Sequence, residues 1–205
     1  MRAALAIGAL AVCAFAHAQA PAKPPPAVPP EKAAKAIASI ALVNPGFEST
    51  RPGQLGAPDG WWAVQHAGPK SYTFELDTAK ARSGERSLRV ENVGPEPFGS
   101  IYQKVAAAPH RGRMLRLAAW VRTQDAKGNR FGAGAGLILH AMRGGYPVAH
   151  IMMRKDAIAG TTDWTRYEVR LAIPADADEI ELGLNLYGPG IAWLDDVALD
   201  VVAAD

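Results

Sequence analysis

The chain has 205 residues, with 22 lysines and arginines against 20 aspartates and glutamates, and its only cysteine is Cys13. This near-balanced charge argues against nucleic acid as a partner, because nucleic-acid-binding domains carry a basic surplus or stripe. No segment has the roughly 20 consecutive apolar residues that a membrane-spanning helix requires. The composition therefore argues against a nucleic-acid-binding domain, a membrane span and a disulfide-bonded scaffold.

The first eighteen residues have the pattern of a secretory signal peptide. Arg2 precedes an apolar run rich in alanine, leucine and valine, and the small residues Ala16 and Ala18 follow it. We predict cleavage near Ala18 and a periplasmic or secreted mature protein. Cys13 would fit a lipoprotein signal, but the preceding residue is a valine where that signal requires a small side chain. The mature chain would have no cysteine and 22 − 1 = 21 basic side chains against 20 acidic ones.

Residues 19–39 are rich in proline and alanine, and they include the run "PAKPPPAVPP". Proline favours extended polyproline geometry, so this segment is predicted to be a linker that holds the next domain away from its neighbour. An unstructured tail without a function is the alternative. Residues 40–203 are enough for one domain with one hydrophobic core.

The rest of the chain has the pattern of β-strands separated by turn residues. Short runs that alternate apolar and polar residues, or that are rich in β-branched and aromatic residues, are divided by Gly, Pro, Asn and Asp. The predicted strands span residues 71–77, 86–93, 100–106, 114–123, 135–142, 148–154, 165–173, 179–187 and 191–202. This pattern predicts an all-β fold, namely a two-sheet antiparallel jelly-roll β-sandwich.

Alternation within these strands separates the residues that face the core from those that face outward. In 179–187 the predicted core residues are Ile180, Leu182, Leu184 and Leu186, and in 115–121 they are Leu115, Leu117, Ala119 and Val121. If the strands are neighbours in one sheet, the outward residues share a concave face: Trp120, Arg122, His140, His150, Asn185 and Tyr187. Trp62, in the first long loop, is a candidate for a second wall of the same groove.

This set of outward residues suits carbohydrate. The apolar face of a sugar ring stacks on an aromatic side chain, while Asn, Arg and His provide hydrogen bonds to its hydroxyl groups. Other interpretations stay open, since Trp120 belongs to the core if its strand is shifted by one residue. An exposed apolar face around Ile138, Met142, Val148 and Met152 would instead favour a protein-interaction module.

Two further alternatives concern the histidines. His140 and His150 could suggest a zinc site, but the sequence offers no third ligand at metal-site spacing. Arg122, His140 and Tyr187 could act as charge neutraliser, base and acid of a polysaccharide lyase, provided that all three reach one sugar ring.

Six sequence blocks occur in a recognisable order. They are "LVNPGFE" (42–48), "PDGWW" (58–62), "SGERSLRV" (83–90), "LRLAAWVRT" (115–123), "GTTDWTRYEVRLAIP" (160–174) and "GIAWLDDVAL" (190–199). Together they resemble the galactose-binding-like β-sandwich superfamily, in particular carbohydrate-binding modules of the family 4/9/22 type, and accessory domains of bacterial exported proteins. The resemblance implies a non-catalytic domain that binds carbohydrate, with a protein-interaction or scaffolding role in the cell envelope as the alternative.

The resemblance also implies a structural calcium ion between the first and the last strand. Its carboxylate ligands would be Glu48 and one of the adjacent residues Asp195 and Asp196. Calcium prefers six to eight oxygen ligands, and a cation would offset the cost of burying a carboxylate in the sheet. In the alternative interpretation the two aspartates cap turns, or pair with Arg86 or Arg89.

Overall fold

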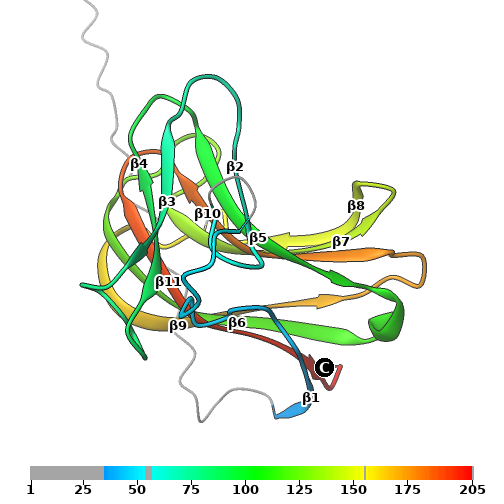
Figure 1. Ribbon diagram of the computed structural model, residues 1–205. Coiled ribbons are helices and arrows are strands. Elements are labelled where there is room, and N and C mark those ends of the chain that lie inside the picture. The colour runs from blue at the N-terminus through cyan, green and yellow to red at the C-terminus, as the bar shows by residue number, and fades with distance from the viewer. Residues whose placement is uncertain (1–34, 54–56, 155, 205) are drawn as a thin grey trace, which may run out of the picture.

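Two antiparallel β-sheets pack face to face in the computed structural model, which describes residues 35–53, 57–154 and 156–204 (Figure 1). The predicted signal peptide and the first part of the predicted linker lie outside the described residues. One sheet has six strands and the other has five. In the described part of the chain, no helix is long and apolar enough to cross a membrane.

The six-stranded sheet has the order β3-β4-β11-β6-β9, with β1 added beside β11. Its strands are β1 (Ala36–Ile40), β3 (Tyr72–Asp77), β4 (Ser87–Asn92), β6 (Met114–Ala126), β9 (Gly160–Ala172) and β11 (Ile191–Val202). One edge of β11 is shared, because β4 pairs with residues 191–194 and β1 pairs with residues 199–202. The first and last strands of the described chain therefore lie side by side.

The five-stranded sheet has the order β2-β5-β10-β7-β8. Its strands are β2 (Trp62–Gln65), β5 (Phe98–Ala106), β7 (Ala135–Arg143), β8 (Tyr146–Met152) and β10 (Glu179–Tyr187). The hairpin of β7 and β8 forms one edge of this sheet. A single turn of 3-10 helix, η2 (Ala108–His110), follows β5.

All nine predicted strands are present, and the all-β two-sheet prediction is confirmed. Two strands were not predicted. Strand β2 has only four residues, and β1 consists of "AIASI", an alanine-rich and mostly exposed segment that is held by its pairing with β11. Strand β1 begins at Ala36, four residues before the position where the sequence analysis starts the sandwich. Alanine has a low intrinsic strand preference, so the local sequence gave no signal for it.

The core lies between the sheets and is built by the residues that alternation assigned to it. On β10, Ile180, Leu182, Leu184 and Leu186 have no exposed surface, and on β6 the four predicted residues are at most 1% exposed. Phe47 and Trp61 close one part of this core, with ring centroids 5.0 Å apart. Trp61 also donates a hydrogen bond from Nε1 to the Asn44 carbonyl oxygen at 3.2 Å.

Removing core volume from the central strand β10 should destabilise the whole domain. We expect Leu184→Ala to lower the free energy of unfolding by about 2–5 kcal/mol, because Leu184 is fully buried and the sheets cannot collapse into the space. Val148→Ala is the matched control, since Val148 is 41% exposed, and its effect should stay within about 0.5 kcal/mol. Urea denaturation measures both, and equal effects would contradict this assignment of the core.

Candidate ligand-binding groove and acidic bulge

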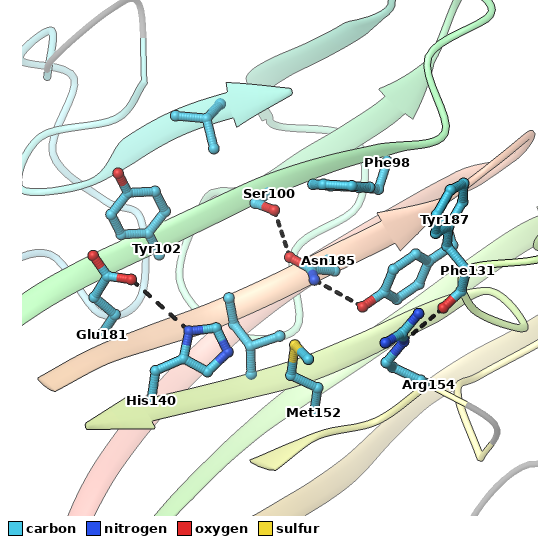
Figure 2. Close-up of a pocket in the computed structure, with 12 residues that line it drawn as sticks. Phe98, Ser100, Tyr102, Phe131, His140, Met152, Arg154, Glu181, Asn185 and Tyr187 are labelled. Atoms are coloured by element: carbon cyan, nitrogen blue, oxygen red, sulfur yellow. Dashed lines mark hydrogen bonds and ion pairs between the residues drawn. The ribbon is translucent and has the colours of Figure 1, made fainter. Parts of the chain in front are cut away.

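A groove of about 620 Å³ runs over the outward face of the five-stranded sheet (Figure 2). All five strands of the sheet, with Phe131 and Arg154 from the adjoining loops, contribute to its lining. Two glycines face outward within the sheet, Gly136 on β7 and Gly183 on β10. A side chain at Gly183 would collide with the β5 backbone, and one at Gly136 would collide with Met153. These two positions therefore require glycine, because the neighbouring backbone leaves no room for a side chain.

A chain of hydrogen bonds crosses the floor at one end of the groove. Ser100 Oγ donates to Asn185 Oδ1 at 2.5 Å, and Asn185 Nδ2 donates to the Tyr187 hydroxyl oxygen at 2.8 Å (Figure 2). Asn185 is 7% exposed and Tyr187 only 3%. Gly132, in the loop before β7, lies directly against the Tyr187 ring. Tyr187 is therefore part of a fixed floor, and burial raises its pKa above the ordinary tyrosine value.

Charged and titratable side chains gather at the other end. Lys104 Nζ lies 3.1 Å from a Glu181 carboxylate oxygen, and His140 Nδ1 lies 3.9 Å from the other one. The neighbouring His140 and then Lys104 hold the pKa of Glu181 below the usual range of a glutamate, against the effect of burial. The second ring nitrogen of His140 is buried and has no hydrogen-bond partner among the described residues. This end of the groove therefore presents an ionised carboxylate beside an imidazole.

Aromatic rings form the wall of the groove on the β2 and β5 side. Tyr102 and Trp62 lie nearly parallel, with an interplanar angle of 16° and centroids 6.2 Å apart. Phe98, further along β5, approaches Tyr187 with a centroid distance of 6.2 Å. The groove thus combines flat apolar surfaces with a few fixed polar groups, which is the usual composition of a small-ligand site.

Three of the seven residues that the sequence analysis selected line the groove: His140, Asn185 and Tyr187. Trp62 is not among the lining residues, and its ring stacks beside that of Tyr102. His150 pairs with His140 across β7 and β8, with ring centroids 6.0 Å apart, and is exposed.

The placement of Trp120 and Arg122 on this face is wrong. Their strand, β6, belongs to the six-stranded sheet, so their side chains point away from the groove on the opposite side of the molecule. The Arg82 guanidinium lies 4.1 Å from the centre of the Trp120 ring, and Arg122 forms an ion pair with Asp163 at 2.6 Å. Alternation assigned the correct face of the strand but could not say which sheet contains it.

The same separation removes the arrangement expected of a lyase, because Arg122 does not share a face with His140 and Tyr187.

The predicted apolar patch is also mostly covered. Ile138 is 4% exposed and Met142 8%, whereas Val148 is 41% exposed.

Several lining residues were not selected from the sequence, among them Tyr102, Phe131, Arg154 and Glu181. Tyr102 and Glu181 alternate with core residues on their strands, so their outward direction was available. Their convergence depends on the pairing of β5, β10 and β7, which places Lys104, Glu181 and His140 opposite one another. Phe131 lies in a loop, and Arg154, the last residue of the predicted strand 148–154, lies just beyond the observed end of β8 at Met152.

The acidic pair Asp195 and Asp196 forms a β-bulge in β11, where the register with β6 shifts and Asp196 adopts a φ of 49°. Asp195 Oδ2 accepts hydrogen bonds from the backbone N–H groups of Arg82 and Ser83, at 2.9 and 3.3 Å. Asp196 Oδ1 accepts one from Ser83 Oγ at 2.6 Å. The interpretation that the aspartates cap a turn is thereby confirmed.

Glu48 holds the other side of the same turn. Its Oε1 accepts hydrogen bonds from the backbone N–H groups of Glu85 and Arg86, at 3.0 and 3.1 Å. Three carboxylates therefore surround the turn 82–86. In the described part of the chain no ion pair joins either aspartate to a basic side chain.

These oxygen donors fit the chemistry of calcium, which the sequence analysis expected here. The side chains alone do not form a complete calcium site. The described residues contain no group of three acidic, histidine or cysteine side chains arranged as a metal site. Backbone carbonyls and water would have to complete the shell. Asp195 has no exposed surface, and burial raises its pKa to about 6. A nearby cation would favour the ionised form of this carboxylate.

Comparison with known sequences gives one distant relative. No protein-family model matches the chain. The uncharacterized HTH-type transcriptional regulator YbfP of Bacillus subtilis strain 168 is 26% identical over 147 residues, which cover 69% of this chain and 48% of that protein. The chain thus spans about half the length of this curated relative.

Comparison with solved structures identifies the architecture. The CBM22-1 xylan-binding domain of Paenibacillus barcinonensis Xyn10C is 15% identical with a TM-score of 0.50, covering 84% of this chain and 98% of that domain. TmCBM61, in complex with beta-1,4-galactotriose, is 17% identical with a TM-score of 0.51. The match covers 78% of this chain and 97% of that module. The fold is the galactose-binding-like β-sandwich.

This β-sandwich is also shared with an enzyme. The Stig cyclase Fisc from Fischerella sp. TAU is 16% identical with a TM-score of 0.56, covering 82% of this chain and 98% of that one. A galactose-binding-like β-sandwich therefore hosts both binding and catalysis, and function has to be argued from the groove.

Asp195 should make the stability of the cation-free protein depend on pH. Its pKa is about 6 in the folded state and about 3.9 in an unfolded chain, so the folded state binds the extra proton between these values. The free energy of unfolding should therefore fall as pH rises through about 6. In the presence of chelator, the free energy of unfolding should fall between pH 5 and pH 7. Asp195 should account for about 1 kcal/mol of that fall.

Urea denaturation at the two pH values checks this contribution. Asp195→Asn should lose this part of the pH dependence, whereas Asp176→Asn, which changes an exposed carboxylate paired with Arg143, should keep the wild-type profile. An unchanged profile in Asp195→Asn would show that the buried carboxylate does not titrate in this range.

Proposed function

We propose that this protein is exported and that it binds an oligo- or polysaccharide, without chemical turnover, in the groove on the five-stranded sheet. The observation that carries the proposal is the combination in one open groove of the flat ring of Tyr102, beside which Trp62 stacks, with fixed polar groups at both ends. The signal-peptide pattern of the first eighteen residues supports export.

The chemistry of a sugar matches this combination. A pyranose ring has an apolar face of C–H groups that packs on a flat aromatic ring, and Tyr102 offers such a ring at the side of the groove. The Glu181 carboxylate accepts hydrogen bonds from hydroxyl groups, and His140 Nε2 is a polar atom that lacks a described protein partner. Because Ser100 and Asn185 hold the floor in one geometry, a ligand would meet polar groups that need little reorganisation.

The structural comparisons support carbohydrate as the ligand, since modules of the same architecture are a xylan-binding domain and a module in complex with beta-1,4-galactotriose. The absence of catalysis is part of the proposal. The catalytic trio that the sequence suggested does not form, because Arg122 lies on the six-stranded sheet while His140 and Tyr187 line the groove on the other sheet.

The alternative partner, a protein of the cell envelope, would need an exposed binding surface. The edge strand β8 is a candidate, because Tyr146 is 77% exposed and Ile151 37%. However, Pro147 interrupts its backbone donors and a bulge shifts its register with β7, and both features oppose pairing with a further strand. The groove is therefore the better-supported site.

We also propose that a calcium ion binds between Glu48 and the bulge at Asp195 and Asp196. The support is the convergence of three carboxylates on the turn 82–86, one of them fully buried. When bound, the ion would supply positive charge to this cluster and fasten the turn to the first and last segments of the fold. The groove lies on the other sheet, so this role is structural.

Removing the Tyr102 ring should weaken glycan binding. A glycan array with the mature protein identifies a ligand, and isothermal titration calorimetry then measures its affinity. We expect Tyr102→Ala to lower this affinity about tenfold or more, because a stacked aromatic ring is a typical binding hot spot. Tyr146→Ala should have no effect, since Tyr146 is exposed at the β7 and β8 turn, outside the groove.

Two outcomes of this experiment would count against the proposal. Binding of no glycan by the wild type would exclude carbohydrate as the ligand. Release of unsaturated product from a bound uronate polymer, seen as new ultraviolet absorbance, would show that the protein is a lyase.

Calcium should raise the melting temperature. At a concentration about 100-fold above its dissociation constant, an ion that binds only the folded state adds about 2.7 kcal/mol, which corresponds to about 5–10 °C for a domain of this size. Glu48→Gln and Asp195→Asn should reduce this shift, and Asp176→Asn should keep it. If excess chelator leaves the wild-type melting temperature unchanged, the calcium proposal is wrong.

A further inference from the structure

The two ends of the groove differ in hydrogen-bonding character. The Glu181 end has a carboxylate that accepts hydrogen bonds, whereas the Tyr187 end holds hydrogen-bond donors and the cationic side chain of Arg154. We propose that the glycan is acidic and that the carboxylate of a uronic acid residue binds between Arg154 and the Tyr187 hydroxyl. This inference rests on the proposed function and assigns it a substrate class.

Arg154 is fixed in place from two sides. Its backbone carbonyl accepts a hydrogen bond from Ala133 N at 2.9 Å, and its side-chain Nε donates to the Phe131 carbonyl oxygen at 2.7 Å. Both contacts attach it to the loop before β7. Figure 2 shows the guanidinium group over the groove, close to the Tyr187 hydroxyl. Among the described residues the guanidinium uses only Nε in this hydrogen bond, so the terminal Nη groups keep their N–H donors for a ligand.

The direction of the floor hydrogen bonds leaves the Tyr187 proton available. Ser100 donates to the Asn185 carbonyl oxygen, which orients the amide so that its nitrogen donates to Tyr187. The Tyr187 oxygen is then an acceptor in this chain, and its own O–H can donate to a further group. The hydroxyl and the guanidinium therefore present donors to the same corner of the groove, as an anionic ligand requires.

The distribution of charge favours an anion at this corner. Glu181 is the acidic residue of the groove lining, and it lies four positions from Asn185, whose amide contacts the Tyr187 hydroxyl, which is about 13 Å along an extended strand. Lys104 also neutralises it, at 3.1 Å. Within the described residues, no carboxylate forms an ion pair with Arg154.

A uronic acid matches the groove better than a neutral sugar. In an oligouronate, one ring can pack its apolar face on Tyr102, while the planar carboxylate of another ring accepts two parallel hydrogen bonds from the Arg154 guanidinium further along the groove. A neutral sugar would leave the fixed guanidinium without an anionic partner.

Isothermal titration calorimetry with paired probes tests the inference. The probes are hexamers of galacturonate and of mannuronate, and glucuronate-substituted xylan fragments, each compared with its carboxyl-reduced neutral form. We expect the wild type to bind at least one acidic probe about tenfold more tightly than the reduced form, since hydrogen bonds to charged groups have this magnitude. Arg154→Gln should bring this ratio close to one, and Arg154→Lys should keep an intermediate ratio.

The control variant is Arg143→Gln, which removes an exposed arginine outside the groove and should retain the wild-type ratio. Melting temperatures confirm that each variant is folded. A ratio that is unchanged in Arg154→Gln would overturn the assignment of Arg154. Equal binding of acidic and reduced probes by the wild type would overturn the acidic substrate but keep carbohydrate binding, whereas binding of no probe and no array glycan would overturn both proposals.

Discussion

The pairing of β10 between β5 and β7 is the constraint on which both the core and the groove depend. Each residue of β10 faces either the space between the sheets or the outer surface, so the same nine residues supply four fully buried aliphatic side chains and three groove residues. A shift of the register by one residue would exchange these two sets. The burial of Leu182 and Leu184 therefore also fixes the positions of Glu181 and Asn185.

A second constraint operates in the other sheet, at the acidic bulge of β11. An ordinary strand would send one of two adjacent aspartates into the core and the other to the surface. The bulge avoids this, because it turns both carboxylates toward the N–H and O–H donors of the turn 82–86. Glu48 binds the same turn from the segment after β1. Three distant parts of the sequence are thus joined by polar contacts at this turn.

The sequence was most informative where side-chain alternation is regular. It predicted nine of the eleven described strands and the inward residues of β6 and β10, because burial imposes a period of two on such segments. It failed for Trp120 and Arg122, whose outward direction was correct but whose sheet was not. Sheet membership depends on long-range pairing, and β6 pairs with β9 and β11 instead of with β7. No local pattern contains that information.

The candidate site shows the same limit. His140, Asn185 and Tyr187 were found because each alternates with core residues, whereas Arg154 lies just after β8 and owes its position to contacts with the loop at Phe131 and Ala133. The need for glycine at positions 136 and 183 was equally hidden, since it depends on the backbone of Met153 and Ile101 in neighbouring segments.

The arrangement of the first and last strands has a consequence for how the domain can be joined to other proteins. Ala36 pairs with Val202, so both termini of the described sandwich leave from one border of the six-stranded sheet. The groove lies on the five-stranded sheet, which is the other layer of the sandwich in Figure 1. A fusion partner connected through either terminus, or through both as an insertion, would leave the path of a long polymer across the five-stranded layer clear.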